Sequence, residues 1–334
     1  MKSIIFAAFA VAVFATSALA EDKVTVQLDW IVRGDHAMFF VAREKGYFTE
    51  QGIDVTAIRR GTGTPNALRL VGGGEADFGF GDLPTLAVAR SQDVPVVALV
   101  AVNQHSPLGM MTLANKFKLQ KPQDLKGLNV GVQPAGSTYV FLRAFLSANG
   151  MTLDDIKQST VNPPYENYLL LGRVDAVPGY LDAEVPELEA KAGGPGSLSI
   201  LQGSDYGYTV YGSGLFTSEK MIAAHSDLVQ RFVNAYAKAF ADVVKNPDEA
   251  VDLTIKDNPE YAQKKDVLSA QLKADLDHTF FSPDTKAHGV GWMTEDIWQK
   301  TIKILVDQNA MKQSIEAAKA FNNQYVGVAN TLKQ

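Results

Sequence analysis

Residues 24–58 read VTVQLDWIVRGDHAMFFVAREKGYFTEQGIDVTAI, and this stretch decides the fold. It opens with apolar residues at every second position over 24–28, which is the period of a half-buried strand. A helix can start at Asp35, and Gly46 is placed to end it, as a glycine does just past the last turn. The apolar run 53–58 predicts a second strand. Strand, helix and strand in this order indicate a parallel α/β sheet.

The same order continues along the chain. Thr64 followed by proline is typical of a helix start, and Asp82 can cap another helix. From Ser218 onward the apolar period becomes helical. Further strands are expected at 77–80, 94–102, 128–132, 156–161, 176–180 and 198–202, and C-terminal helices at 267–277, 295–307 and 315–324. The sequence therefore predicts an α/β protein with a mostly helical C-terminal segment.

Two lobes fit this order, because the helical C-terminal part has no strands of its own and must pack on an earlier sheet. We expect a discontinuous first lobe of residues 21–107 and 211–334. The second lobe would comprise residues 108–210. Crossings near 105–112 and 206–214 would form the hinge.

The first 20 residues resemble a cleavable signal peptide. An apolar run over 4–14 follows Lys2, and the small residues Ala18 and Ala20 suit a signal peptidase. The run is too short to cross a bilayer, which takes about 20 apolar residues. No cysteine follows it, so a lipid anchor on cysteine is excluded. We expect a monomer that is released into the periplasm and is not anchored to the membrane.

Composition excludes several classes of function. The 334 residues carry a formal charge of −6 and include no cysteine, which rules out disulfides and thiolate chemistry. The basic pairs Arg59-Arg60 and Lys264-Lys265 are isolated, whereas a nucleic-acid binder needs clustered lysines and arginines. We therefore expect no nucleic-acid partner.

Candidate ligand-binding residues follow the ends of the predicted strands, because ligands of parallel α/β sheets bind outside the carboxyl ends of the strands. The candidates are Trp30, His36, Thr62, Thr64, Asp82, Asn103, Gly136, Ser137, Thr138, Tyr165, Tyr180 and Asp182. They combine aromatic faces with small polar groups and helix N-termini, a surface suited to a small planar or anionic metabolite.

Each candidate also has a purely structural interpretation. Trp30 and the tyrosines can be packing residues, and His36 can be a structural cap. The hydroxyl residues and Asp82 suit helix N-caps whether or not a ligand is present.

Signatures of catalysis are missing from the sequence. It has no G-x-S-x-G elbow, no P-loop and no H-E-x-x-H motif. Its five histidines are scattered without the spacing of metal ligands. We expect no enzyme activity, no cofactor and no metal.

An ordered series of short motifs resembles one family of transport proteins. The series consists of LDW at 28–30, AREKGYF at 42–48, GIDV at 52–55, GEADFG at 74–79, VPVV at 94–97 and PQDLKG at 122–127. It is similar to the substrate-binding proteins of the nitrate, sulfonate, taurine and thiamine-pyrimidine group of ABC importers. The resemblance implies a two-lobed, type II periplasmic binding fold that holds its ligand between the lobes. It also implies a permease and an ATPase as partners.

Within this group, the Trp30 and His36 pair looks most like the binders of the thiamine pyrimidine precursor. Arg33 and Arg60 instead suit an anion clamp, so a sulfonate, taurine, nitrate or an aromatic carboxylate is the alternative ligand. The group also includes eukaryotic pyrimidine synthases, which rely on a cysteine-rich segment and iron. This chain has an export signal and contains no cysteine, so we do not expect it to be such an enzyme.

Overall fold

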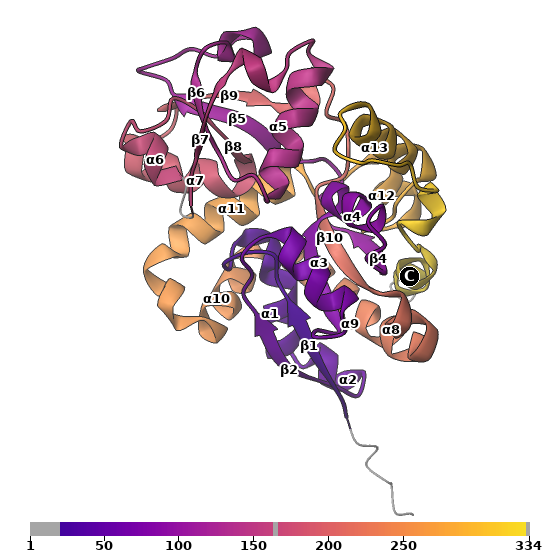
Figure 1. Ribbon diagram of the computed structural model, residues 1–334. Coiled ribbons are helices and arrows are strands. Elements are labelled where there is room, and N and C mark those ends of the chain that lie inside the picture. The colour runs from indigo at the N-terminus through magenta and orange to yellow at the C-terminus, as the bar shows by residue number, and fades with distance from the viewer. Residues whose placement is uncertain (1–20, 163–165, 332–334) are drawn as a thin grey trace, which may run out of the picture.

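The structure is a computed structural model that describes residues 21–162 and 166–331. It contains two bodies, each built around its own sheets, and the chain passes between them twice (Figure 1). We call the body with the five-stranded sheet lobe 1 and the other body lobe 2. The expected signal peptide, residues 1–20, lies outside the described residues and stays a prediction.

The sheet of lobe 1 has the strand order β2-β1-β3-β10-β4. Its strands are β1 (Asp22–Gln27), β2 (Ile53–Arg59), β3 (Phe78–Asp82), β4 (Val96–Ala101) and β10 (Ser213–Ser218). β1 pairs in parallel with β2 and β3, as the sequence predicts. β10 is antiparallel to both of its neighbours, so the complete sheet is mixed. It runs in this direction because it returns from lobe 2 and enters the sheet between β3 and β4 at the carboxyl ends of the parallel strands, where Ser213 pairs with Asp82.

Helices cover this sheet on both sides. The helices of lobe 1 are α1 (Ala37–Glu44), α2 (Tyr47–Glu50), α3 (Thr64–Gly72), α4 (Leu83–Arg90), α8 (Glu219–Ala224), α9 (Ser226–Lys245), α10 (Pro247–Asp257), α11 (Lys265–His278), α12 (Pro283–His288), α13 (Glu295–Asp307) and α14 (Gln324–Thr331). α9 contributes buried residues to the same core as β1 and β3, and its Phe232 ring stacks on Phe78 at 3.7 Å. Gly46 adopts φ 73° just beyond α1, the conformation for which glycine is suited.

Lobe 2 contains one three-stranded and one two-stranded sheet. Its elements are β5 (Leu108–Leu113), β6 (Asn129–Val132), β7 (Lys157–Thr160), β8 (Val177–Tyr180), β9 (Leu198–Gln202), α5 (Ser137–Ala148), α6 (Glu166–Leu170) and α7 (Leu181–Ala192). β5 was not predicted as a strand. It lies between β8 and β9, antiparallel to both, and every one of its residues is buried. Residues expected to form only a crossing therefore also build the centre of this sheet.

The helix expected at 315–324 does not form. The segment contains only a short 3-10 turn, Ala317–Lys319. Its backbone instead bonds to the edge strand β4, where the Ala98 N–H donates to the Ala320 carbonyl at 2.9 Å. Phe321 stacks on the buried Trp298 with ring centroids 5.8 Å apart. Pairing with an open sheet edge thus outweighs the helical pattern of the sequence.

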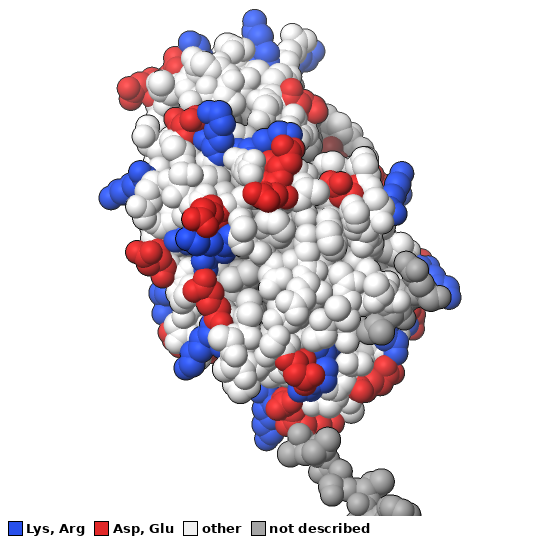
Figure 2. Space-filling view, turned by 90° about the vertical axis from the view of Figure 1, so that its right-hand side faces the viewer, with Lys and Arg blue, Asp and Glu red and all other residues white. Residues whose placement is uncertain are grey.

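The surface carries interleaved charges of both signs. On the face shown in Figure 2, Lys and Arg side chains lie among Asp and Glu side chains, mostly around the margin of a broad uncharged area. This face therefore has no basic patch of the kind that nucleic-acid binding requires. In the part of the chain that the structure describes, no helix is long and apolar enough to span a membrane.

Candidate functional site

The cleft between the lobes has two parts, which we call the inner pocket and the outer cavity. The inner pocket has a volume of about 30 Å³, the space of roughly one water molecule. The outer cavity has a volume of about 420 Å³, within the usual range for a small-molecule site. Trp30, Arg33 and Glu184 line both, so the two parts are neighbours in one cleft.

Both lobes line the inner pocket. The lining residues are Asp29, Trp30, Arg33, Gly63 and Thr64 of lobe 1, and Gln133, Gly136, Ser137, Thr138, Tyr180 and Glu184 of lobe 2. The structure thus brings together Trp30, Thr64, Gly136, Ser137, Thr138 and Tyr180 from the predicted ligand-binding set, together with Arg33 from the predicted anion clamp.

Arg33 is enclosed by the chain's own carboxylates. Its guanidinium contacts Asp29 at 3.0 Å and Asp35 at 3.0 Å, and its side chain is only 6% exposed. Burial by itself would lower the pKa of Arg33, but the two carboxylates outweigh it and raise the pKa well above its usual range. Burial likewise acts to raise the pKa of Asp29, and Arg33 and His36 lower it overall. The charge predicted for an anion clamp is therefore already balanced within the chain.

His36 lies behind this group and does not line the cleft. It is 0% exposed, and its edge packs against the Phe80 ring at 5.0 Å. Its Nε2 lies 3.0 Å from Asp29 Oδ1, and its Nδ1 accepts the Arg33 backbone N–H at 3.3 Å. Since the backbone N–H must donate, Nε2 carries the proton that bonds to Asp29. The imidazole thus holds Asp29 and the turn after β1 in place.

The lobe 2 wall is formed by the starts of α5 and α7. Gly136 is the N-cap of α5, and Ser137 Oγ accepts a hydrogen bond from the Tyr180 hydroxyl at 2.8 Å. The Arg33 guanidinium stacks over the Tyr180 ring at 4.7 Å. The predicted capping by Ser137 or Thr138 is wrong, because glycine takes the cap position and both hydroxyl residues lie within the first turn. Their side chains are thereby left to line the pocket.

Thr64 lines the inner pocket, whereas the predicted site residue Asp82 lies behind it and lines neither part of the cleft. Asp82 caps α4 as predicted, with the Thr85 N–H donating to its Oδ1 at 2.8 Å. Thr64 does not cap α3; its hydroxyl accepts the Asp82 N–H at 3.1 Å, and Gly63 is the cap. The second oxygen of Asp82, Oδ2, has no hydrogen-bond partner. Burial raises the pKa of Asp82 to about 7.

Four predicted residues lie elsewhere. Thr62 is exposed and accepts a hydrogen bond from Asn66. Arg60 pairs with Glu260 and stacks over Tyr261 at 5.3 Å, outside both parts of the cleft.

Asn103 and Asp182 are buried beside Asp275 of α11. Neither lines the inner pocket or the outer cavity. Tyr165 lies outside the described residues and stays a prediction.

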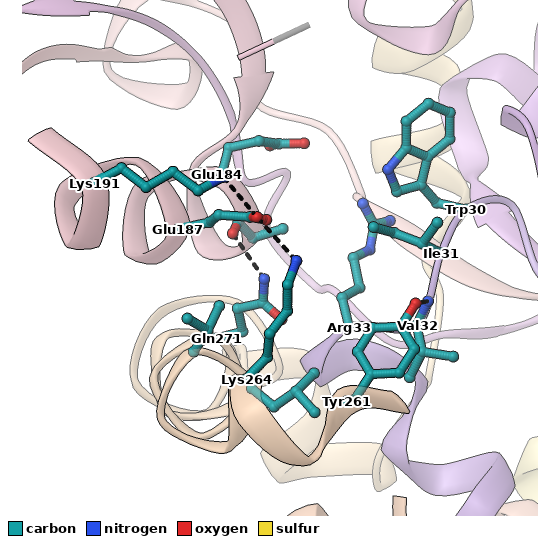
Figure 3. Close-up of a pocket in the computed structure, with 13 residues that line it drawn as sticks. Trp30, Ile31, Val32, Arg33, Glu184, Glu187, Lys191, Tyr261, Lys264 and Gln271 are labelled. Atoms are coloured by element: carbon teal, nitrogen blue, oxygen red, sulfur yellow. Dashed lines mark hydrogen bonds and ion pairs between the residues drawn. The ribbon is translucent and has the colours of Figure 1, made fainter. Parts of the chain in front are cut away.

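The outer cavity has an apolar side and a charged side. Figure 3 shows Trp30 and Ile31 across the opening from Glu184 and Glu187 of α7. Lys264 bridges the lobes by an ion pair with Glu187 at 3.1 Å.

A second bridge lies deeper in the cleft. Gln271 of α11 donates to the Ala183 carbonyl at 2.8 Å. Both bridges join α7 of lobe 2 to the C-terminal helical part of lobe 1, so the lobes are in contact along this side of the cleft, and we call this the closed arrangement.

Comparison with known proteins gives this geometry a context. The model of the family described as NMT1/THI5 like matches residues 33–250. The chain belongs to the NMT1/THI5-like family. The match includes Arg33, His36, Asp82 and the whole of lobe 2, whereas Trp30 and α11 lie outside it.

Relatives in sequence include binding proteins and enzymes. The chain is 27% identical to the formylaminopyrimidine-binding protein of Halalkalibacterium halodurans over 91% of each chain. It is 26% identical to the riboflavin-binding protein RibY of Chloroflexus aurantiacus, over 91% of this chain and 86% of that protein. It is also 26% identical to the 4-amino-5-hydroxymethyl-2-methylpyrimidine phosphate synthase THI13 of Saccharomyces cerevisiae, over 74% and 76% of the two chains.

Solved structures show the fold. A protein of Bordetella bronchiseptica RB50 superposes with a TM-score of 0.73 at 21% identity, covering 94% of this chain and 98% of that one. The alkanesulfonate-binding protein SsuA of Xanthomonas axonopodis pv. citri superposes with a TM-score of 0.69 at 17% identity, covering 91% and 99%. The predicted two-lobed periplasmic binding fold with a helical C-terminal segment is thereby confirmed.

Several cleft residues of this family member escaped the sequence analysis. Glu184 lies one helical turn after Tyr180, so the start of α7 could have revealed it. Tyr261 and Gln271 come from the C-terminal helical part, where nothing in the local pattern separates a cleft residue from a core residue. In the described residues, no group of three or more His, Cys, Asp or Glu is arranged to hold a metal ion.

Proposed function

We propose that this protein is the periplasmic solute-binding component of an ABC importer. Its ligand would be a small, planar, uncharged or weakly basic heterocycle of the thiamine-pyrimidine-precursor type. The observation that carries this proposal is the cleft itself, where the aromatic side chains Trp30 and Tyr261 lie across from polar groups and where the lining arginine, Arg33, is already paired with two carboxylates.

The charge of the cleft disfavours an anionic ligand. Arg33 is shared by two carboxylates, and the N-terminus of α4, a natural anion site, is occupied by Asp82. Lys191 and Lys264, the lysines that line the outer cavity, are both paired with Glu187 of α7. A sulfonate, nitrate or carboxylate would enter a cleft whose positive groups are already paired, so these alternatives rank below the pyrimidine type.

Aromatic surface supports a flat ligand. Trp30 lines both parts of the cleft, and Tyr261 lines the outer cavity beside Ile31, which is 43% exposed. Such side chains offer contact area at low cost in conformational entropy. The names of two relatives, a formylaminopyrimidine-binding and a riboflavin-binding protein, agree with a heterocyclic ligand.

Transport requires export, ligand release and docking to a permease. We propose that residues 1–20 are removed on export and that the protein acts as a monomer. Hinge bending at the two passages between the lobes would open the closed arrangement. Intact mass of the exported protein tests the first point, with cleavage before Glu21 expected and a retained Met1 contradicting it.

Binding without catalysis is also part of the proposal. The synthase relatives make an enzyme the competing function. Incubation with iron and pyridoxal phosphate should leave the mass of His36 unchanged, because its ring is enclosed by Asp29, Arg33 and Phe80. Loss of mass at His36 would favour the synthase function instead.

A thermal-shift screen tests the ligand class. The panel is formylaminopyrimidine, 4-amino-5-hydroxymethyl-2-methylpyrimidine, riboflavin, benzoate, ethanesulfonate, taurine and nitrate. A ligand at 100 times its dissociation constant stabilises the fold by about 2.7 kcal/mol, which gives a clear shift. We expect a pyrimidine to raise the Tm and the anions to leave it unchanged. A shift with ethanesulfonate or nitrate alone would overturn the proposal.

A further inference from the structure

Two buried carboxyl groups meet where the lobes touch. Asp182 lies in the first turn of α7 of lobe 2 and is 6% exposed, and Asp275 lies on α11 of lobe 1 and is 1% exposed. Gln271 and Asp275 lie one turn apart on α11, which brings the Asp275 carboxyl group next to the start of α7. The two carboxyl groups are within hydrogen-bonding reach, since a hydrogen bond between them contributes to the pKa of each. Figure 1 shows α7 and α11 side by side, and Gln271 of α11 bonds to the residue that follows Asp182.

The remaining contacts hold both groups in place. Asp275 Oδ1 accepts from Asn103 Nδ2 at 2.9 Å and from the Thr279 hydroxyl at 2.9 Å. Asp182 Oδ1 accepts the Ala183 N–H at 2.8 Å. Asn103 also accepts the Ser213 N–H at 3.2 Å, so it ties Asp275 to the start of β10, where the chain returns from lobe 2.

A hydrogen bond between two carboxyl groups requires a proton, because two ionised carboxylates have none to donate. We propose that Asp182 and Asp275 form a proton-binding latch, so that closure of the cleft takes up one proton and opening releases it. The latch rests on the hinge closure of the proposed function and not on the identity of the ligand.

The surrounding charges give the pair no other means of neutralisation. Arg33 is the cation that acts on Asp182, and it is already bonded to Asp29 and Asp35. Asp35 adds a further negative charge that acts on both members of the pair.

Among the residues that the structure describes, the other groups near the latch bring no positive charge to it. The His36 ring is occupied by Asp29 and the Arg33 N–H. Tyr236 of α9 acts on Asp35 and stays neutral, because burial raises the pKa of its phenol well above 10. Asn103 and Thr279 are uncharged, and Glu184 is the next carboxylate along α7.

The direction of the pH effect follows from these surroundings. Burial raises the pKa of Asp182 to about 6. Burial, then Asp182 and Asp35, raise the pKa of Asp275 well above its usual range. In an open arrangement both groups regain water and ordinary pKa values near 4. The closed form therefore binds more protons between about pH 4 and the raised pKa of the pair, and closure becomes more favourable as the pH falls.

Interlobe distance measured without ligand tests the latch. The chain has no cysteine, so Leu171→Cys in lobe 2 and Val244→Cys in lobe 1 introduce two labelling sites at exposed positions. Energy transfer between the two dyes reports the ratio of closed to open molecules from pH 5 to pH 8. We expect this ratio to rise by up to tenfold for each unit by which the pH is lowered.

Two variants and one control complete the test. In Asp275→Asn the amide oxygen can still accept from Asn103 while the amide N–H donates to Asp182, so closure should lose its pH dependence and persist at pH 8. If Asp275→Asn fails to fold, Asp182→Asn takes its place in the test, and its closure should likewise be independent of pH. Asp277→Asn changes an exposed carboxylate of the same helix, paired with Lys273, and should keep the wild-type pH profile.

The outcomes separate the latch from the proposed ligand. A pH-independent distance in the labelled wild-type chain, or a wild-type pH profile in both latch variants, would overturn the latch. This holds whether or not formylaminopyrimidine binds. A pH-dependent distance that Asp275→Asn abolishes supports the latch even if no pyrimidine in the thermal-shift panel binds. A lack of pyrimidine binding would contradict only the proposed ligand.

Discussion

The inner pocket and the outer cavity adjoin each other but use their polar groups differently. In the inner pocket, Arg33 and Asp29 are bonded to residues of their own lobe, and the free volume is about 30 Å³. In the outer cavity, about 420 Å³ remains between apolar side chains and a bridge between the lobes, Lys264–Glu187. Charged residues at a cleft are thus not by themselves ligand clamps, because their bonding partners decide whether any charge is left for a ligand.

The largest expected effect breaks the charge balance of the inner pocket. Arg33→Met leaves Asp29 and Asp35 buried without their cation, and this should lower the free energy of unfolding by about 3–5 kcal/mol. Urea denaturation at pH 7 measures the loss. The matched control is Arg69→Met, whose pair with Glu75 is exposed and whose loss should be about 0–1 kcal/mol. Equal losses in the two variants would mean that the ion pairs of Arg33 contribute little to stability. Arg33 would then again be a candidate for binding an anionic ligand.

A second experiment addresses Asp82, which lies behind Thr64 of the inner pocket, through the pH dependence of stability. The pKa of Asp82 is about 7 in the folded chain, above its unfolded value near 4, so the folded state binds more protons between these values. Stability should therefore fall as the pH rises through this window, by at most about 1.4 kcal/mol per pH unit from this group.

Asp82→Asn keeps an oxygen that can cap α4 but removes the titrating group. The stability of the variant should fall less than that of the wild-type chain between pH 5 and pH 7 in urea denaturation. Asp296→Asn, at an exposed position on α13, serves as control and should keep the wild-type slope. A wild-type slope in Asp82→Asn would show that Asp82 is ionised throughout.

Trp30, which lines both parts of the cleft, should contribute more to ligand affinity than to the stability of the fold. Trp30→Ala removes stacking area and should weaken formylaminopyrimidine binding by about 1–3 kcal/mol in isothermal titration calorimetry. Trp292→Ala is the control, because Trp292 stacks on His288 away from the cleft, and its affinity should match the wild type. Unchanged affinity in Trp30→Ala, combined with a loss in Arg33→Lys, would favour an anionic ligand.

The smallest effect is expected at the outer bridge. Lys264→Gln removes an ion pair between the lobes whose lysine is 47% exposed, so binding should weaken by only about 0.2–1 kcal/mol. Lys191→Gln removes the pair that the same Glu187 makes within α7, and it should have no effect on closure. The difference between the two variants should shrink in high salt. A loss above about 2 kcal/mol in Lys264→Gln would mean that Lys264 contacts the ligand directly.

Local rules of the sequence determined much of the molecule. The apolar period before Asp29, the glycine at position 46 and the acidic cap at Asp82 each act over a few residues, and each appears in the structure as predicted. The strand ends likewise supplied much of the inner pocket, because the ends of parallel strands meet at one edge of a sheet whatever lies farther along the chain.

Tertiary structure alone decided which groups face the ligand and which face each other. His36 and Asp182 follow strand ends as the candidates should, yet one is enclosed behind Asp29 and the other meets Asp275 from the C-terminal helices. Arg33 is a residue type that suits an anion clamp, but its surroundings are those of a structural ion pair. Periodicity and capping depend on neighbours in sequence, whereas the partner of a buried charge depends on elements that packing brings together from distant parts of the chain.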